Sequence, residues 1–353
     1  MFAFTASRDF FAVVVRPGAL ATVGAMVRRG VVVAVLLVLL VPAAALTVLR
    51  LGDPGWVLAV QAVTFAPAAL VLYALALLVL VVAALRSAGG ARLLAGVVAV
   101  LVVVPLALHA SWFAPQVAGA EPAAAPDAVP LRVMTSNLLR GDGDPADVVA
   151  AAREARADLV VLPEATARTT RALGRLGADE AWPHRAGRAG ADIEGTLVLS
   201  ADPVRDVRVL PTQLDSVAFT VERGDRDLRV LAVHPIAPYD GAAGWRRDHA
   251  AILAAVRRER PDVVLGDFNA TMDHRPMRRL AAEGYRTATE VANEGWRPTW
   301  PVNGLFSLGP LPLPRSAEID HVLVRDGTAV LGTERHLVAG TDHLALSADL
   351  RLR

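Results

Sequence analysis

The sequence predicts an apolar membrane region followed by one mixed α/β domain. Three observations support this fold class. Hydrophobic residues make up 54% of the 353 residues, and most of the excess lies before residue 115. After residue 130, short apolar runs typical of strands alternate with amphipathic stretches typical of helices. Most of the polar residues that could take part in catalysis or metal binding directly follow an apolar run, and strand ends are where α/β proteins place their chemistry.

Three apolar runs are long enough to cross a bilayer as helices. They cover residues 30–49, 56–85 and 93–114. About 20 apolar residues span the hydrocarbon core, whereas a soluble core helix shows polar positions every few residues. A cleaved signal peptide is the alternative for the first run, but two further runs follow it. We therefore expect a membrane region over residues 1–114.

Arginines in the short flanking segments predict the orientation of these spans. The loop between the first two spans contains only Arg50, offset by Asp53, and Trp56 and Trp112 mark the span ends on that side. The remaining flanking arginines are Arg8, Arg16, Arg28, Arg29, Arg86 and Arg92. Because positive residues stay inside, we expect a multi-pass cell-membrane protein with a cytoplasmic N-terminus and an extracellular C-terminal domain.

Residues 115–130 are rich in Pro and Ala and predict a semi-extended linker before a domain over residues 131–353. The absence of cysteine excludes disulfides and Cys metal sites, and the net charge of +1 gives no general case for a polyanion partner. Helices are expected from Asp144-Pro145 to Arg156 and over Ala242–Arg258. The predicted strands are 131–136, 158–162, 195–200, 204–210, 216–222, 227–234, 262–265, 319–324 and 344–350.

The segment Gly266-Asp267-Phe268-Asn269 follows an apolar strand and is a candidate catalytic element. Asp267 and Asn269 project to one side if the chain stays extended. Asp267 can then accept a proton from an attacking water, and Asn269 can hold that water or a phosphoryl oxygen. The alternative is an ordinary turn, since Asp, Asn and Gly are turn formers.

Two further residues are candidate metal ligands. Glu164 follows the strand Leu159–Leu162, and its carboxylate is a suitable hard ligand for Mg²⁺. Asn137 follows the first strand, and its amide oxygen can bind the same ion or a phosphate. A solvated glutamate and a turn asparagine are the alternative interpretations.

The vicinal pair Asp342-His343 precedes the last strand. Neighbours on an extended chain point to different sides, so Asp342 can face a metal while His343 faces a phosphoryl group. Asp320 can fix the tautomer of that imidazole and stabilise its cationic form. The next residue, His321, would face the opposite side and is expected to be structural.

His234 ends the strand Leu228–Val233 and can donate to a phosphate oxygen, although a lone histidine is more often a packed or surface residue. The other histidines are expected to be packed or surface residues. These are His109, His184, His249, His274 and His336.

Taken in order, these motifs resemble the endonuclease/exonuclease/phosphatase superfamily, whose fold is that of deoxyribonuclease I. Gly266–Asn269 matches its GDFN signature letter for letter, Pro163-Glu164 matches its PE pair, and Thr341-Asp342-His343 matches its terminal Ser-Asp-His with threonine for serine. Asn137, His234 and Asp320 fall on its other expected positions, and Thr299-Trp300 on its threonine-tryptophan pair. Two positions depart from the family pattern: Ala201 replaces an arginine, and His-Pro-Ile-Ala-Pro follows the His234 strand.

The resemblance implies a four-layer α/β sandwich with two mixed sheets, preceded here by three transmembrane helices. It implies attack of water on a phosphate ester with Mg²⁺, or Mn²⁺ in its place. We therefore expect a membrane-anchored phosphodiesterase or phosphatase acting on phospholipid headgroups or lipid-linked phosphates. An extracellular nuclease, with nucleic acid as substrate, is the first alternative. A catalytically degenerate binding or signalling module is the second, and the sequence carries no signal for an oligomeric state.

Overall fold

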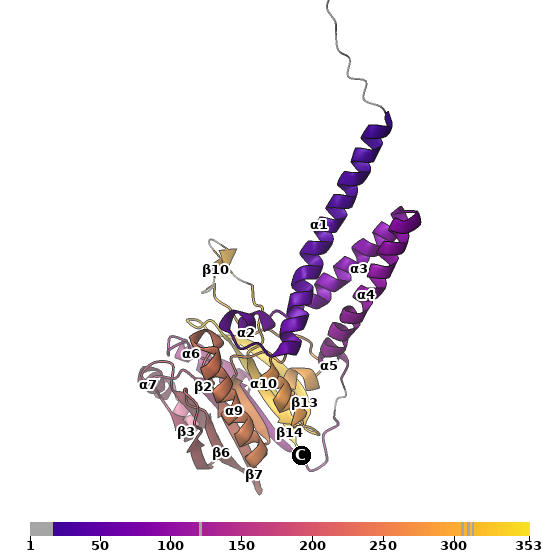
Figure 1. Cartoon of the computed structure of the whole chain (residues 1–353). Helices are drawn as coiled ribbons and strands as arrows, with labels where there is room; N and C mark the ends of the chain where they lie inside the picture. Colours follow the sequence, from indigo (N-terminus) through magenta and orange to yellow (C-terminus); the bar gives the residue numbers. More distant parts are fainter. Residues whose placement is uncertain (1–16, 120–121, 305–306, 309–310, 313) are drawn as a thin grey trace, which may run out of the picture.

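The computed structural model describes residues 17–119, 122–304, 307–308, 311–312 and 314–353. Among these residues, three long apolar helices stand on one side of an α/β domain (Figure 1). Their apolar stretches are long enough to cross a membrane, as predicted. They are α1 (Pro17–Gly52), α3 (Ala68–Arg86) and α4 (Gly89–Phe113). Arg8 and Arg16, used above to predict the orientation, lie outside the described residues.

The second apolar run is not one continuous helix, so its predicted range of 56–85 is wrong. A short helix, α2 (Val57–Val63), is separated from α3 by a turn over residues 64–67. Pro67 stands at the start of α3, where its missing N–H costs no helical hydrogen bond. Ala59, Val60 and Val63 of α2 are buried. Hydropathy alone does not separate such a helix from a membrane span.

The three long helices are joined by a polar cluster with one residue from each. The Oγ1 of Thr47 lies 3.0 Å from the Oη of Tyr73 and 2.9 Å from Nε2 of His109. Hydrogen bonds between apolar helices are a recognised source of association in membranes. This cluster therefore fixes the helices relative to one another.

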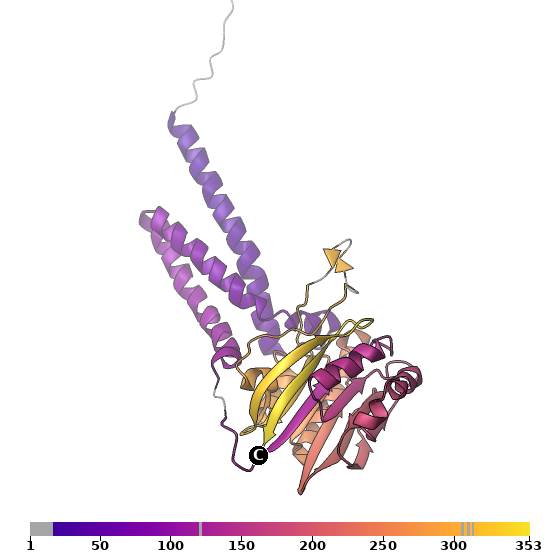
Figure 2. The same cartoon turned by 180° about the vertical axis from the view of Figure 1, so that it is seen from behind.

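The α/β domain contains two six-stranded mixed sheets (Figure 2). The first sheet has the order β13-β14-β1-β2-β4-β3 and the second β5-β6-β7-β8-β12-β9. The first consists of β1 (Val129–Thr135), β2 (Leu159–Pro163), β3 (His184–Arg188), β4 (Thr196–Ser200), β13 (Ala329–Leu337) and β14 (Leu344–Leu352). The second consists of β5 (Val204–Val209), β6 (Val217–Arg223), β7 (Arg226–Val233), β8 (Val263–Asp267), β9 (Tyr285–Thr287) and β12 (Asp320–Arg325). A separate pair is formed by β10 (Ser307–Leu308) and β11 (Leu311–Pro312).

Helices cover the outer face of each sheet and complete the four predicted layers. One apolar core lies between the sheets, a second beneath the helices of the first sheet, and a third beneath those of the second. The covering helices are α6 (Pro145–Glu154), α7 (Ala167–Arg175) and α8 (Ala178–Ala181) on the first sheet, and α9 (Ala242–Glu259) and α10 (Arg275–Ala282) on the second. The remaining short helices are α5 (Pro115–Ala118), η1 (Pro238–Asp240) and α11 (Ala288–Val291).

The local signals that predicted these elements have the expected geometry. Asp144 caps α6 by accepting a hydrogen bond from the backbone N–H of Ala146, and Pro145 occupies the first helical position. Each predicted strand is present within a few residues of its expected bounds. The strands β3, β9 and β13 were not predicted, because their polar residues interrupt the apolar alternation.

Candidate active site

The strand pairing brings the predicted polar residues to one edge of both sheets. In the first sheet, β1 runs parallel to β2 and antiparallel to β14, so the residues that follow or precede these strands meet. In the second sheet, β7 runs parallel to β8, and Asp320 at the start of β12 lies directly opposite Asp267 at the end of β8. Asn137, Glu164 and the Asp342-His343 pair therefore come from one sheet, and His234, Asp267 and Asp320 from the other.

Asn137 links the two sheets through its amide group. Its Nδ2 donates to Oε1 of Glu164 at 3.0 Å and to Oδ2 of Asp267 at 2.9 Å. Its Oδ1 accepts from the backbone N–H of Leu139 at 2.9 Å. In this arrangement the amide nitrogen faces the carboxylates, whereas the predicted metal-ligand role requires the oxygen to face them. A rotation of the amide about its last bond would exchange the two atoms.

Glu164 is held in a backbone conformation that few glutamates adopt. Its φ is +60°, in the left-handed region. Besides the bond from Asn137, its Oε2 accepts from the backbone N–H of Arg140 at 2.7 Å. Burial raises the pKa of Glu164, while these two hydrogen bonds lower it in part. Residues in such strained conformations cluster at functional sites.

Asp267 occupies the centre of the cluster. Its Oδ1 accepts from the backbone N–H of Asn269 at 2.7 Å, and its side chain is 1% exposed. Asn269 itself has a φ of +48° and donates from Nδ2 to the backbone oxygen of Pro235 at 3.1 Å. Burial raises the pKa of Asp267 to about 7, although the charge of His343 opposes the shift. A carboxyl group with this pKa is suited to accept a proton near neutral pH.

His343 and Asp320 form a buried ion pair. The Nδ1 of His343 lies 2.8 Å from Oδ2 of Asp320, and its Nε2 lies 3.9 Å from Oδ2 of Asp267. Burial lowers the pKa of His343, but the carboxylates of Asp320, Asp267 and Asp342 outweigh it and raise the pKa to about 10. The imidazole is therefore cationic at neutral pH, with its Nε2 directed towards the carboxylate cluster.

His234 faces the same cluster from the end of β7. Its Nε2 lies 3.7 Å from Oε1 of Glu164 and 3.9 Å from Oδ2 of Asp267. Burial, and then the charge of His343, lower the pKa of His234 to about 3, so this ring is neutral at physiological pH. The two histidines thus differ in charge because only one of them contacts an ionised carboxylate at hydrogen-bonding distance.

Asp342 is held by Trp300, which the arguments from single residues did not predict. The Nε1 of Trp300 donates to Oδ2 of Asp342 at 2.7 Å, whereas Oδ1 of Asp342 is buried and has no hydrogen-bond partner among the described residues. The neighbouring Thr299 accepts from the backbone N–H of Asp320 at 3.3 Å. Only the resemblance of the Thr299-Trp300 pair to a family pattern pointed to these two supports.

Tyr239 was also missed by the sequence analysis. It lies on η1 and is 64% exposed; partial burial raises its pKa to about 12, with Asp240 and the carboxylates of Glu164, Asp267 and Asp342 adding to the shift. Its side chain therefore stands close enough to the cluster to experience its negative charge. No motif could have identified it, because the sequence around η1 departs from the family pattern.

The donor set fits a hard divalent cation. Carboxylate oxygens are the ligands that Mg²⁺ and Mn²⁺ prefer, and the partnerless oxygens of Asp342 and Asp320 are buried beside the other acidic groups. Ligand atoms of Asp267, Asp320 and His343 also lie within 4.8 Å of one another. The Nδ1 of His343 already contacts Asp320. The more available ligands are therefore Glu164 and Asp342.

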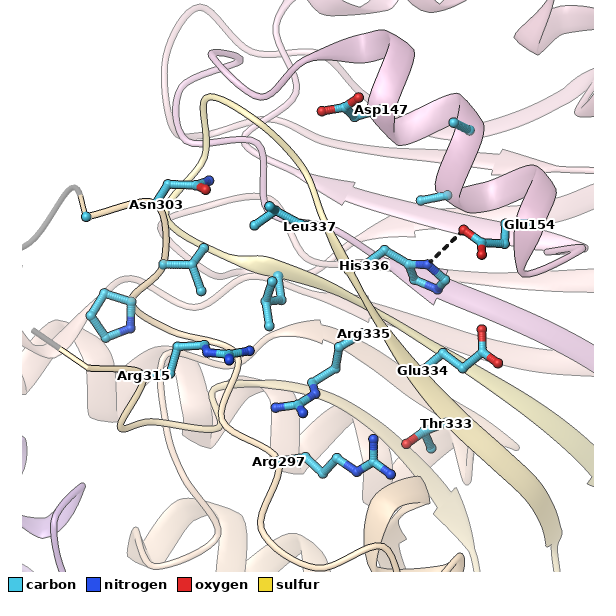
Figure 3. A pocket seen from close by; sticks show the side chains of 16 residues that line it. Asp147, Glu154, Arg297, Asn303, Arg315, Thr333, Glu334, Arg335, His336 and Leu337 are labelled. Carbon is cyan, nitrogen blue, oxygen red and sulfur yellow. Dashed lines mark ion pairs between the residues drawn. The ribbon is translucent and has the colours of Figure 1, made fainter.

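One cavity lies outside this cluster. It has a volume of about 1120 Å³ and is lined by α6, β13 and the segment around Pro301. Arg297, Arg315 and Arg335 gather at one end of it (Figure 3).

His321, expected to be structural, is buried and bonds through Nε2 to the backbone oxygen of Ala270 at 2.9 Å.

Comparison with known proteins agrees with this architecture. Danio rerio TDP2 in complex with a single-stranded DNA product is 14% identical, with a TM-score of 0.51, over 63% of this chain and 99% of that chain. An endonuclease/exonuclease/phosphatase from Beutenbergia cavernae is 21% identical (TM-score 0.49; 63% and 72% covered), and sphingomyelinase C from Streptomyces griseocarneus is 18% identical (0.42; 63% and 99%). No curated protein matches the sequence.

The sequence profile described as "Endonuclease/Exonuclease/phosphatase family" matches residues 134–343. This match begins within β1 and ends at His343, so it contains every residue of the cluster described above. The chain therefore belongs to the endonuclease/exonuclease/phosphatase family.

Proposed function

We propose that this protein is a membrane-anchored phosphoesterase that depends on a divalent cation and acts outside the cytoplasm. The observation that carries the proposal is the contact network around Asp267. Asn137 and Asn269 bond to its carboxylate, and the imidazoles of His234 and His343 each approach it to 3.9 Å. A buried base between a neutral and a cationic imidazole is an arrangement suited to ester hydrolysis.

The proton and charge roles follow from these contacts. Asp267 accepts the proton of the attacking water, and Asn269 fixes the carboxylate through its backbone N–H. His343, cationic and held by Asp320, donates from Nε2 to a phosphoryl oxygen. His234, which is neutral, supplies a second donor without adding charge. Groups preorganised in a buried site stabilise the charge of the transition state more strongly than water does.

A cation at Glu164 and Asp342 would complete the charge balance. Mg²⁺, or Mn²⁺, would neutralise phosphate charge and assist departure of the leaving oxygen. Asn137 would join these ligands if its amide rotated, and in the present rotamer it orients Glu164 instead. The partnerless Oδ1 of Asp342 supports this assignment, because a buried carboxylate oxygen without a donor is costly unless a cation occupies its vicinity.

Extracellular action is supported by the distribution of arginine along the helices. Arg86 ends α3 and Arg92 lies in the first turn of α4, at helix ends that are distant from the α/β domain (Figure 1), and Arg28 and Arg29 lie in the N-terminal half of α1. If these ends are cytoplasmic, three crossings place the domain outside. A nuclease acting on extracellular nucleic acid is the alternative substrate class within this chemistry.

A catalytically degenerate module is the alternative of another class. The completeness of the cluster argues against it, because each of the eight predicted positions has a residue of a competent type and each contacts another member, Asn269 through its backbone N–H. These residues are Asn137, Glu164, His234, Asp267, Asn269, Asp320, Asp342 and His343.

The test is a hydrolysis screen of the full-length protein with Mg²⁺, Mn²⁺ or a chelator. Its substrates are a soluble diester, a soluble monoester, single-stranded DNA and phospholipid vesicles. We expect cation-dependent hydrolysis of at least one substrate, and a higher Mg²⁺ requirement for Glu164→Ala than for Glu154→Ala, an exposed control. Absence of hydrolysis with every substrate and cation would favour the degenerate module.

A further inference from the structure

The position of α2 in the chain places it at one boundary of the membrane region. α1 ends at Gly52 just before α2, and α3 begins at Ala68 just after it. The apolar stretch between Arg29 and Arg50 contains 20 residues, and α3 contains 19, each close to the length that crosses a hydrocarbon core. If both helices cross a bilayer, α2 lies at the surface that faces the α/β domain (Figure 1).

The two faces of α2 have different surroundings. Val60 packs into the apolar core beneath α9, together with Trp245. By contrast, Leu58 of α2 and the flanking residues Trp56 and Phe65 are 71%, 63% and 50% exposed. Such a group of large apolar side chains is unfavourable in water, whereas the interface of a bilayer accommodates it, and tryptophan is enriched there.

A short path of contacts joins α2 to the catalytic loop that follows β8. The backbone oxygen of Val60 lies 2.9 Å from Nε2 of His274. The ring of His274 packs edge-on against the ring of Trp245, with centroids 5.4 Å apart. The Nε1 of Trp245 then donates to the backbone oxygen of Asn269 at 3.0 Å. The loop that follows Asp267 is thus connected to α2 through only two side chains, His274 and Trp245.

The end of α1 contacts the same loop. The Nε of Arg50 lies 2.6 Å from Oδ1 of Asp273, with 9% and 16% of the two side chains exposed. The guanidinium group of Arg50 also stacks 3.5 Å from the ring centroid of Trp112, near the end of α4. The end of α1, which also contacts α4, therefore binds a residue four positions after Asn269 and so holds the active site close to the ends of the spans.

Tyr239 lies beside α2. It belongs to η1, which packs against α2, and it is 64% exposed. A half-apolar, half-polar side chain at this position suits a boundary between headgroups and acyl chains. Because η1 begins four residues after His234, α2 packs against a segment that leads away from the carboxylate cluster.

We infer that Leu58 of α2 and the flanking residues Trp56 and Phe65 are embedded in the outer leaflet and so hold the active site against the lipid headgroups, where its substrate is the phosphoester of a lipid in that same leaflet. This inference rests on the proposed function and specifies its substrate class. The large exposed side chains of α2, its flanking residues and η1 are apolar or aromatic, whereas nucleic-acid binding requires a continuous basic surface along the phosphate backbone.

The activity test compares lipid and soluble substrates with one protein. Full-length protein is reconstituted in phosphatidylcholine vesicles that contain phosphatidylglycerol as a diester or phosphatidic acid as a monoester. Bis(p-nitrophenyl) phosphate and single-stranded DNA are the soluble probes. Leu58→Ser/Phe65→Ser is compared with Leu331→Ser, a control on β13 that is 60% exposed. We expect the double variant to lose about tenfold or more of its lipid hydrolysis, because two apolar anchors are removed, and to retain hydrolysis of the soluble diester.

A second measurement reports directly on membrane contact and does not depend on activity. The chain contains no cysteine, so Leu58→Cys and Leu331→Cys each give a single labelling position. With an environment-sensitive fluorophore attached, we expect quenching by nitroxide-labelled lipids at position 58 and none at position 331. Absence of quenching at position 58 would overturn the inference even if the double variant failed to fold.

The outcomes separate the inference from the proposed function. Hydrolysis of soluble diester or DNA without any hydrolysis of lipid would leave the phosphoesterase intact and overturn the lipid substrate. Equal lipid hydrolysis by the double variant and the wild type would also leave the phosphoesterase intact, but it would overturn the anchoring role of α2. Failure to hydrolyse every probe would instead remove the proposed function on which the inference rests.

Discussion

His343 and Asp320 are 23 residues apart in sequence, yet Nδ1 of the histidine lies 2.8 Å from Oδ2 of the aspartate in the buried centre of the site. The pairing follows from topology. Asp320 begins β12 in one sheet, and His343 precedes β14 in the other, so the contact forms only when the two sheets stack. This ion pair keeps the imidazole cationic and aimed at the carboxylate of Asp267.

We predict that losses at these two positions are not additive. His343→Ala removes the donor to the phosphoryl oxygen, and we expect kcat to fall about 10²–10⁴-fold. Asp320→Asn retains the shape but removes the charge that supports the cation, so its loss is smaller. Because residues that act as a unit are non-additive, the double variant should resemble His343→Ala alone in steady-state kinetics. Losses that multiply fully would show that the two residues act independently.

The pH dependence of kcat should follow the ionisation of Asp267. Burial raises the pKa of this residue to about 7, and a general base must be deprotonated to accept a proton. Activity is therefore lost as pH falls through about 7, and an adjacent cation shifts this midpoint downward. Values of kcat measured between pH 5 and 9 on a soluble diester test the direction of this pH dependence. A rate that increased as the pH fell through this range would contradict the assignment.

The ion pair between Arg50 and Asp273 should contribute to the stability of the whole chain. Both side chains are largely buried, so removal of one partner leaves an uncompensated charge that costs about 3–5 kcal/mol. We expect Arg50→Ala and Asp273→Ala each to lower the thermal midpoint of the detergent-solubilised protein. The double variant should recover part of the loss, since neither charge remains. The control is Arg205→Ala, at an exposed position. An equal change in the thermal midpoint of all four variants would rule out a specific role of the ion pair between Arg50 and Asp273.

The orientation of the chain is tested with reporters of export. A reporter fused after Arg353 should be active only where exported proteins are active, and one placed between Arg86 and Arg92 only in the cytoplasm. The reason is the excess of arginine at one end of the three helices. A C-terminal reporter that is active in the cytoplasm would contradict both the extracellular location and the proposed outer-leaflet substrate.

Much of the domain could be predicted from the sequence because its core strands are short apolar runs with a polar residue at one end. Asp267 and Glu164 were identifiable for this reason, and the structure places both at strand ends. The three apolar helices were predicted by length and composition. The edge strands β3 and β13 were not, because strands with one exposed edge tolerate polar residues on both faces.

Other features could not be predicted because they depend on tertiary contacts. Trp300 supports Asp342 from 42 residues away, and apart from the resemblance of the Thr299-Trp300 pair to a family pattern nothing in the sequence indicates this bond. The division of the run 56–85 escaped prediction because an apolar helix packed on a domain and one in a membrane have the same hydropathy. The amide orientation of Asn137 likewise depends on Leu139, Glu164 and Asp267 together.

The most direct test of the central claim is the kcat of Asp267→Asn on a soluble phosphodiester in the presence of Mg²⁺. Asparagine preserves the size of the side chain but removes its basicity, so substrate binding should persist. We predict that kcat falls about 10²–10⁴-fold while KM changes little. A variant that retained the wild-type kcat would show that Asp267 is not the base and would contradict the proposed chemistry.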